Sequence, residues 1–161
     1  MHTIMNRKNN PIIGVGIMLI DQRQKVLLGY RNKDDETASW CFPGGKIDAH
    51  ESIEDAAVRE LFEETALDLN QDIESIHPLN TIIDQNSDAV KVTFGTIYQL
   101  LDDRLKTQIC VTEPEIFERW EWFNIDELPQ PLFPETEVMI KYFLNQPQDN
   151  SWLVYSLSNN E

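Results

Sequence analysis

Apolar residues recur with two different spacings along this chain. Short runs rich in β-branched and aromatic residues are typical of strands, whereas one stretch without Gly or Pro, rich in Glu, Ala, Leu and Arg, is typical of a helix. Strands are expected at Ile12–Ile20, Val26–Tyr30, Trp40–Phe42, Ile73–Asp84, Val90–Leu101 and Phe117–Phe123. Helices are expected at Ser52–Ala66 and Thr136–Leu144. Strands separated by one central helix and closed by another favour an α/β sandwich.

One domain is expected over residues 1–161. This length suits one hydrophobic core, and 41% hydrophobic with 25% charged residues is an ordinary globular composition. Residues 1–10 and 147–161 are mostly polar and are expected to be flexible or peripheral tails. The longest apolar run, Ile12–Ile20, is too short to cross a bilayer as a helix, and the residues before it do not match a signal peptide. A cytoplasmic protein with no membrane partner is therefore expected.

The formal net charge is −15, which repels nucleic acid, so no nucleic-acid partner is expected. A small phosphorylated substrate stays compatible with this charge, because a bound divalent cation supplies positive charge locally. The three histidines are scattered and indicate no zinc site. The two cysteines, Cys41 and Cys110, have no metal-binding spacing and are expected to be buried free thiols.

Three carboxylates of the central helix, Glu60, Glu63 and Glu64, are spaced three and four residues apart and therefore crowd onto one side. The apolar residues Val58, Leu61 and Phe62 fall on a different side, which is expected to pack while the other side presents the acidic residues. Taken alone, the cluster is more typical of a solvated acidic face. Arg59 beside it either orients a carboxylate or forms a plain ion pair one turn away along the helix.

The segment before this helix changes the interpretation. Pro43-Gly44-Gly45 is expected to be a tight turn that lets backbone approach a ligand closely and adds carbonyl oxygens. Oxygen donors without Cys or His suit Mg²⁺ or Mn²⁺. The acidic cluster and the glycines together therefore favour a metal site.

These residues fit a longer pattern with fixed spacing. Starting from Gly45, the charged positions are Glu51, Arg59, Glu60, Glu63 and Glu64. The segment closely resembles the Nudix box, Gly-x5-Glu-x7-Arg-Glu-U-x-Glu-Glu-x-Gly-U, in which U is a bulky aliphatic residue. Ala66 stands where the family usually has the glycine that ends the helix, so we expect a cost in stability or a changed exit angle.

The resemblance extends from about Pro11 to Leu144 and is to the MutT-like nucleoside-triphosphate subgroup of the Nudix family. Further matching segments are Gly14–Gly16, Val26–Arg31, Trp40–Lys46 and Trp120–Pro129. The fold implied is an α/β/α sandwich around a mixed β-sheet. The activity implied is Mg²⁺-dependent hydrolysis, with Mn²⁺ as a substitute, of a nucleoside triphosphate to the monophosphate and pyrophosphate.

The resemblance also implies roles for individual residues. Glu60, Glu63, Glu64 and the Gly44 carbonyl would hold the metal, supported by Glu51 and Arg59. A neighbouring glutamate would accept the proton from the attacking water. The catalytic candidates are Arg59, Glu63, Glu64 and a glutamate from a later loop, for which Glu115 is the first choice and Glu113 and Glu118 compete.

The substrate pocket is harder to read from the sequence. Lys46 is either a phosphate contact or a surface lysine, and aromatic residues in strands are more often core than pocket. The substrate-binding candidates are Lys46, Arg31 and Phe133, with Trp40, Phe94 and Leu132 as further lining candidates. An ADP-ribose-type substrate and a silent nucleotide-binding regulator are the alternatives, although a regulator typically lacks box carboxylates that are kept here. The resemblance is also compatible with a homodimer.

Overall fold

Strand β1 (Ile12–Asp21) lies at the centre of a mixed eight-stranded sheet in the computed structural model, which describes residues 10–157. It pairs in parallel with β6 over its whole length and antiparallel with β2 and β4. The strand order is β3-β2-β1-β6-β5-β8, and β7 pairs with β2. The remaining strands are β2 (Lys25–Arg31), β3 (Ser39–Cys41), β4 (Gly44–Lys46), β5 (His77–Asp84), β6 (Lys91–Leu100), β7 (Phe117–Asn124) and β8 (Trp152–Ser156).

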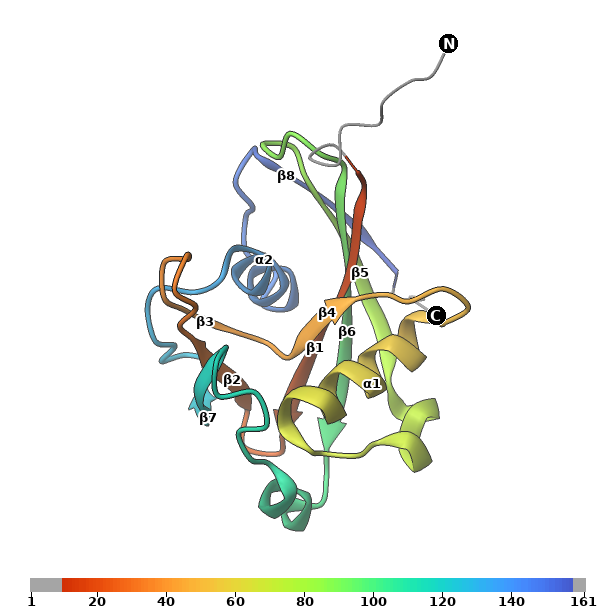
Figure 1. Cartoon of the computed structure of the whole chain (residues 1–161), viewed down its shortest axis with the longest axis vertical. Coiled ribbons are helices and arrows are strands. Elements are labelled where there is room, and N and C mark those ends of the chain that lie inside the picture. Colours follow the sequence, from red (N-terminus) through yellow and green to blue (C-terminus); the bar gives the residue numbers. More distant parts are fainter. Residues whose placement is uncertain (1–9, 158–161) are drawn as a thin grey trace.

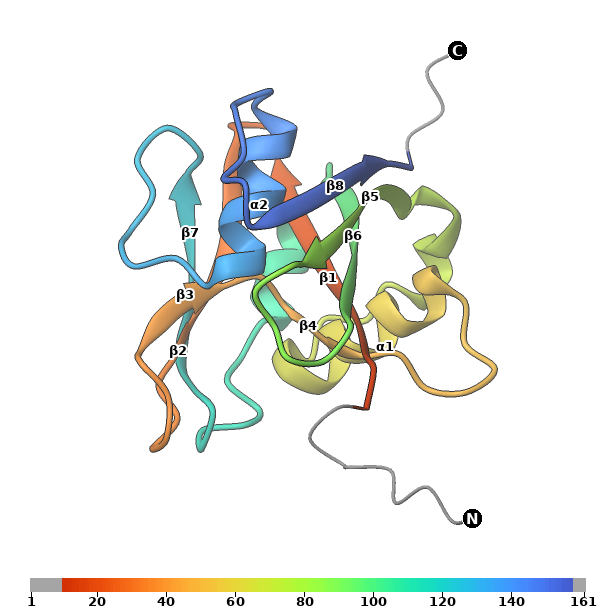
Figure 2. The same ribbon diagram turned by 90° about the horizontal axis from the view of Figure 1, so that it is seen from above.

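Two helices, α1 (Ile53–Thr65) and α2 (Pro134–Phe143), cover opposite faces of the sheet (Figures 1 and 2). Side chains alternate across a strand, so Ile17 and Leu19 of β1 pack in the core on the α1 side. Met18 and Ile20 pack in the core on the α2 side. The expected α/β/α sandwich around a mixed sheet is therefore confirmed. None of the helices within residues 10–157 is long and apolar enough to span a bilayer.

Helix α1 begins at a capping box, in which the Ser52 side chain accepts from the Asp55 N–H and the Asp55 side chain accepts from the Ser52 N–H. It ends at Ala66, which has φ 65° and ψ 1°, the left-handed conformation that favours glycine. Leu61 is buried as expected, but Phe62 is 51% exposed, so the prediction that it packs was wrong. The buried side of the helix includes Val58, Leu61 and Thr65, and Phe62 lies outside it, toward solvent.

Several predicted element boundaries need correction. Residues 70–75 form a 3₁₀ helix, so β5 begins at His77 rather than Ile73. Helix α2 begins at Pro134, because proline suits the first helical position, where no N–H is needed. Within the segment expected to be a flexible or peripheral tail from residue 147, Trp152–Ser156 form strand β8 at the edge of the sheet (Figure 2). This strand pairs with β5, and Trp152 and Val154 pack against the core. The predicted N-terminal tail falls on residues outside the described range, except for residue 10.

The two cysteines differ from each other. Cys41 is a buried free thiol in β3, as expected. Cys110 is also free but exposed, so the prediction that it is buried was wrong. It follows a 3₁₀ helix at Asp103–Gln108 and lies in a loop rather than a strand.

Candidate active site

The segment Gly44–Lys46 lies between β1 and α1 and brings backbone against the acidic side of the helix. It is strand β4, with Gly16 opposite Gly44 and Val15 opposite Gly45. The prediction of a tight turn was therefore wrong, and no glycine within residues 10–157 has a positive φ. The glycines are needed for close approach: a Cβ at Gly44 would overlap the Val15 carbonyl oxygen, and one at Gly45 would lie 2.5 Å from both carboxylate oxygens of Glu60.

The three helix carboxylates have unequal surroundings. Glu64 is only 5% exposed, and its Oε1 accepts a 2.7 Å hydrogen bond from the Gly44 N–H. The Glu60 side chain is 14% exposed, against the glycine strand, whereas the Glu63 side chain is 51% exposed. Solvent exposure therefore rises across the cluster, from Glu64, which β4 covers, to Glu63, which is open to solvent. The cluster is not a uniformly solvated face.

Arg59 connects these groups. Its guanidinium donates to both carboxylate oxygens of Glu51, at 2.6 and 2.9 Å, and to Glu60 Oε1 at 2.9 Å. It also donates to Glu63 at 3.2 Å and to the Lys46 carbonyl at 2.9 Å. Asp48 lies 3.4 Å from the same guanidinium. One arginine therefore joins the loop between β4 and α1, strand β4 and two of the helix carboxylates in a single network.

Burial and crowding set the protonation behaviour of the carboxylates. Burial raises the pKa of Glu64 to about 8; the Gly44 N–H opposes this rise, and the charges of Glu60 and Glu113 add to it. Burial also raises the pKa of Glu60, although Arg59 opposes this. The hydrogen bonds from Arg59 hold the pKa of Glu51 below its usual value. The site therefore carries more negative charge than its one arginine balances.

A later loop closes the C-terminal end of α1 and brings a further carboxylate to the site. The Cys110 N–H donates to the Thr65 carbonyl at 2.9 Å, the Thr112 hydroxyl donates to the Glu63 carbonyl, and the Trp120 indole donates to the Glu64 carbonyl at 3.2 Å. These carbonyls have no partner within the helix because they belong to its last turn. The loop is thus anchored on the backbone of Glu63 and Thr65, and Trp120 of strand β7 adds a contact to that of Glu64.

Among the three candidate loop glutamates, Glu113 is the one whose charge affects the pKa of the helix carboxylates. Its charge raises the pKa of both Glu60 and Glu64. Its own pKa is raised by burial and by the charges of Glu115 and Glu63. The first choice, Glu115, is exposed, and Glu118 accepts a 2.8 Å hydrogen bond from Asn32. The electrostatic effect of Glu113 on the cluster, and its position directly after the anchor at Thr112, therefore favour it over Glu115.

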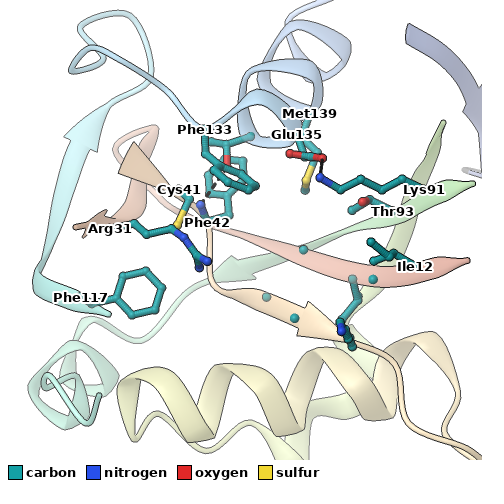
Figure 3. Close-up of a pocket in the computed structure, with 17 residues that line it drawn as sticks. Ile12, Arg31, Cys41, Phe42, Lys91, Thr93, Phe117, Phe133, Glu135 and Met139 are labelled. Carbon is teal, nitrogen blue, oxygen red and sulfur yellow. Dashed lines mark hydrogen bonds and ion pairs between the residues drawn. The ribbon is translucent and has the colours of Figure 1, made fainter. Parts of the chain in front are cut away.

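A pocket of about 270 Å³ opens between strands β1 and β4 of the sheet and the start of α2 (Figure 3). Lys46, Arg31 and Phe133 all line it. The other three lining candidates do not line this pocket: Trp40 is buried in the core on the α2 side, Leu132 packs against that core, and Phe94 pairs with Thr81 in β5. Phe133 arrives there because the preceding segment pairs with β3, where the Trp40 N–H donates to the Pro131 carbonyl and the Phe133 N–H to that of Trp40.

Two charged pocket residues, Lys91 and Glu135, were not among the predicted site residues. Glu135 is the second residue of α2, where an acidic side chain is ordinary, and Lys91 is the first residue of a strand. Nothing in the local sequence pattern separates them from surface charges. Only the pairing of β6 with β1 and the packing of α2 on the sheet bring them into one pocket.

The fold and the box together define a Nudix protein: the NUDIX domain family model matches residues 10–143, and the chain belongs to this family. It is 30% identical over 156 residues to the oxidized purine nucleoside triphosphate hydrolase of Mus musculus, covering 88% of this chain and 91% of that one. It is 26% identical to the RNA pyrophosphohydrolase of Novosphingobium aromaticivorans over 132 residues, covering 74% and 81%.

The solved structures agree with this assignment. The crystal structure of a MutT NUDIX hydrolase from Burkholderia pseudomallei matches with a TM-score of 0.69 and 28% identity, covering 82% of this chain and 97% of that one. The expected Nudix resemblance is confirmed, and with it a pyrophosphohydrolase that acts on phosphoanhydride bonds.

Proposed function

We propose that this protein hydrolyses a nucleoside triphosphate to the monophosphate and pyrophosphate, in the cytoplasm, with Mg²⁺ or with Mn²⁺ as a substitute. One observation carries the proposal: β4 presses backbone against Glu60 and Glu64 at the edge of a pocket large enough for part of a nucleotide. An acidic cluster without that strand and pocket would be a surface feature. The 30% identity to a nucleoside triphosphate hydrolase supports the same substrate class.

The residues fit a divalent cation by their chemistry. Glu60, Glu63 and Glu64 with the Gly44 carbonyl would supply only oxygen donors, as Mg²⁺ prefers. Burial, and after it repulsion from neighbouring carboxylates, raises the pKa of Glu60 and Glu64, and a bound cation would relieve that repulsion. Among residues 10–157, no three acidic, histidine or cysteine side chains already converge as a metal site. Arg59 holds Glu60 and Glu63, and Glu64 is turned to the Gly44 N–H.

When bound, the cation supplies charge neutralisation at the phosphate oxygens and a lower pKa for the attacking water. The chain's own residues position and activate the reactants. Arg59 fixes the directions of Glu60 and Glu63 through its hydrogen bonds. The Glu113 carboxylate takes the proton of the attacking water, the role first given to Glu115, since burial and neighbouring charges raise its pKa and make it a stronger proton acceptor.

The substrate is oriented by the pocket. The Phe133 ring provides an apolar face for the base, and Arg31 lies 5.7 Å from the centre of that ring. Lys46 lies beside the glycines at the pocket wall and contacts the phosphates. The net charge of −15 favours a small nucleotide over a long RNA, whose many phosphates would be repelled.

A hydrolysis panel tests the proposal. Canonical and oxidised nucleoside triphosphates, ADP-ribose, a dinucleoside polyphosphate and a 5′-triphosphorylated RNA are incubated with the purified chain and Mg²⁺, and the products are resolved. We expect monophosphate and pyrophosphate from a triphosphate, with loss of turnover in Glu63→Gln and in Glu60→Gln. Glu121→Gln, on the outer strand β7, is the matched control and should keep wild-type activity. Turnover of ADP-ribose or RNA alone, or full activity in both site variants, would overturn it.

A further inference from the structure

Strand β8 forms one edge of the sheet, and no other strand within residues 10–157 pairs with its outer side (Figure 2). The Leu157 N–H donates to the Leu79 carbonyl at 3.1 Å. The Gln85 N–H donates to the Ser151 carbonyl at 2.9 Å. In this antiparallel pairing with β5, the backbone groups of successive residues alternate between pointing toward β5 and away from it. The N–H and carbonyl of Val154 therefore point away from β5, and the described chain offers them no backbone partner.

The other edges of the sheet are protected against pairing with another chain. Proteins protect such edges with short strands, covering segments or charged side chains. Strand β3, at the opposite end of the strand order, has three residues, and residues 131–133 hydrogen-bond to its outer side at Trp40. Strand β7, which pairs with β2, carries the charged residues Glu118, Arg119 and Glu121. Strand β8 lacks this protection, since residues 151–157 contain no charged residue and no proline.

The face of β8 that points away from α2 is apolar and exposed. Trp152 and Val154 pack against the core on the α2 side, so the alternate residues point to the opposite face. On that face Leu153 is 36% exposed, Tyr155 54% and Leu157 38%. An edge strand with an apolar face and open backbone groups is a template for pairing with a further strand.

Charge and sequence indicate which strand fits this edge. The chain carries a net charge of −15, so two copies repel each other over most of their surface and can meet only through a neutral segment such as β8. The strand is also self-complementary about its central residue, Val154. In an antiparallel pair centred there, Leu153 lies opposite Tyr155 of the second copy, in a non-hydrogen-bonded pair whose side chains approach closely. Trp152 lies opposite Ser156, so the largest side chain of the strand meets the smallest.

We propose that this protein forms a symmetric homodimer in which β8 pairs antiparallel with β8 of a second copy, about a two-fold axis at Val154. The Val154 N–H of each copy donates to the Val154 carbonyl of the other, which joins the two eight-stranded sheets into one. Leu153 and Tyr155 are buried against each other on both sides of the axis. No described residue of β5 or β8 lines the candidate substrate pocket, so the dimer does not depend on the function proposed above.

The wild-type chain provides the first test. In analytical ultracentrifugation over a hundredfold range of concentration, we expect the mass to rise from 18.7 kDa toward twice this value. Amide exchange followed by NMR should show protection of the Val154 N–H that increases with concentration, whereas the Leu153 N–H, which points toward β5, should be protected throughout. A chain that stays monomeric with Val154 exchanging freely would overturn the proposal and leave β8 open to a strand of a different protein. A dimer in which Val154 stays unprotected would overturn it as well.

Charged variants at the exposed positions test the pairing register. Leu153→Lys and Tyr155→Glu should each weaken the dimer by about tenfold or more, because each buries a charge without a partner. In a mixture of the two variants the lysine lies opposite the glutamate, and a heterodimer should form. Leu101→Lys makes the same change at a residue that is 64% exposed and lies outside β8, and should leave the dimer unchanged. Dimers that both β8 variants retain, or a mixture that stays monomeric, would overturn the proposed interface.

Discussion

The Glu60 carboxylate occupies the space that a side chain at Gly45 would need: a Cβ there would lie 2.5 Å from each of its oxygens. We therefore expect Gly45→Ala to displace Glu60 and lower kcat by about 10- to 100-fold, as misplacements of about 1 Å can do. Steady-state kinetics and circular dichroism of the variant check this. In a Glu60→Ala background the same change should cost much less, because the space is then free. Equal losses in both backgrounds would show that the glycine acts elsewhere.

Arg59 acts through the fork of its guanidinium, which contacts Glu51, Glu60 and Glu63 together. We expect Arg59→Lys to keep the charge but lose this geometry, and to lower activity by roughly 10- to 100-fold, as changes to residues that orient metal ligands do. Arg104→Lys is the matched control, since Arg104 makes a similar two-bonded pair with Asp102 on the exposed surface. Wild-type kinetics in Arg59→Lys would contradict the role.

Ala66 holds a left-handed conformation at the end of α1 without the freedom of glycine. We expect Ala66→Gly to raise the free energy of unfolding by about 1 kcal/mol and the Tm by about 2–4 °C. Thermal unfolding measured by calorimetry checks this. Ala57→Gly, in the right-handed interior of the same helix, should instead lower the Tm. If both glycines destabilise the chain, the conformation at Ala66 is not strained.

The box was predictable because its information is local: helix spacing and fixed charges identified Arg59, Glu60, Glu63 and Glu64 without any knowledge of the sheet. The sandwich was predictable because strand and helix periods alternate along the chain. The left-handed conformation at Ala66 agrees with the expected cost, which the Ala66→Gly measurement will test.

Other features depended on tertiary pairing and could not be predicted from local patterns. Gly44 and Gly45 suggested a turn, but they pair with β1 as a strand. Glycine is needed at both positions because neighbouring backbone and the Glu60 side chain leave no room for a Cβ. Strand β8 lies in a mostly polar segment, and only its pairing with β5 identifies it as a strand. Lys91 and Glu135, 44 positions apart in the numbering, meet only when α2 packs on the sheet.

Thr112 anchors the loop that carries Glu113 by donating its hydroxyl to the Glu63 carbonyl. We expect Thr112→Val to leave that carbonyl without this partner and to loosen the loop, so that kcat falls several-fold while KM changes little. Thr112→Ser keeps the hydroxyl and should retain most of the activity. Steady-state kinetics on both variants check the prediction. Equal loss in the serine and valine variants would contradict the prediction, because the serine variant keeps the hydroxyl.

Glu64 links stability to pH and to metal removal. In the folded chain burial raises its pKa from an ordinary value of 4.5 to about 8. The unfolded chain therefore releases this proton first as pH rises, and the stability that the protonated group contributes is complete below pH 4.5 and lost by about pH 8. In EDTA, we expect Glu64→Gln to gain Tm over the wild type progressively between these limits, by an amount equivalent to a few kcal/mol at most. Thermal unfolding across pH 5 to 9 checks this.

Added Mg²⁺ should raise the wild-type Tm most at the alkaline end, where the carboxylate is ionised, and should raise that of Glu64→Gln less. A Tm difference that stays constant across the range would mean that Glu64 is already ionised in the folded chain.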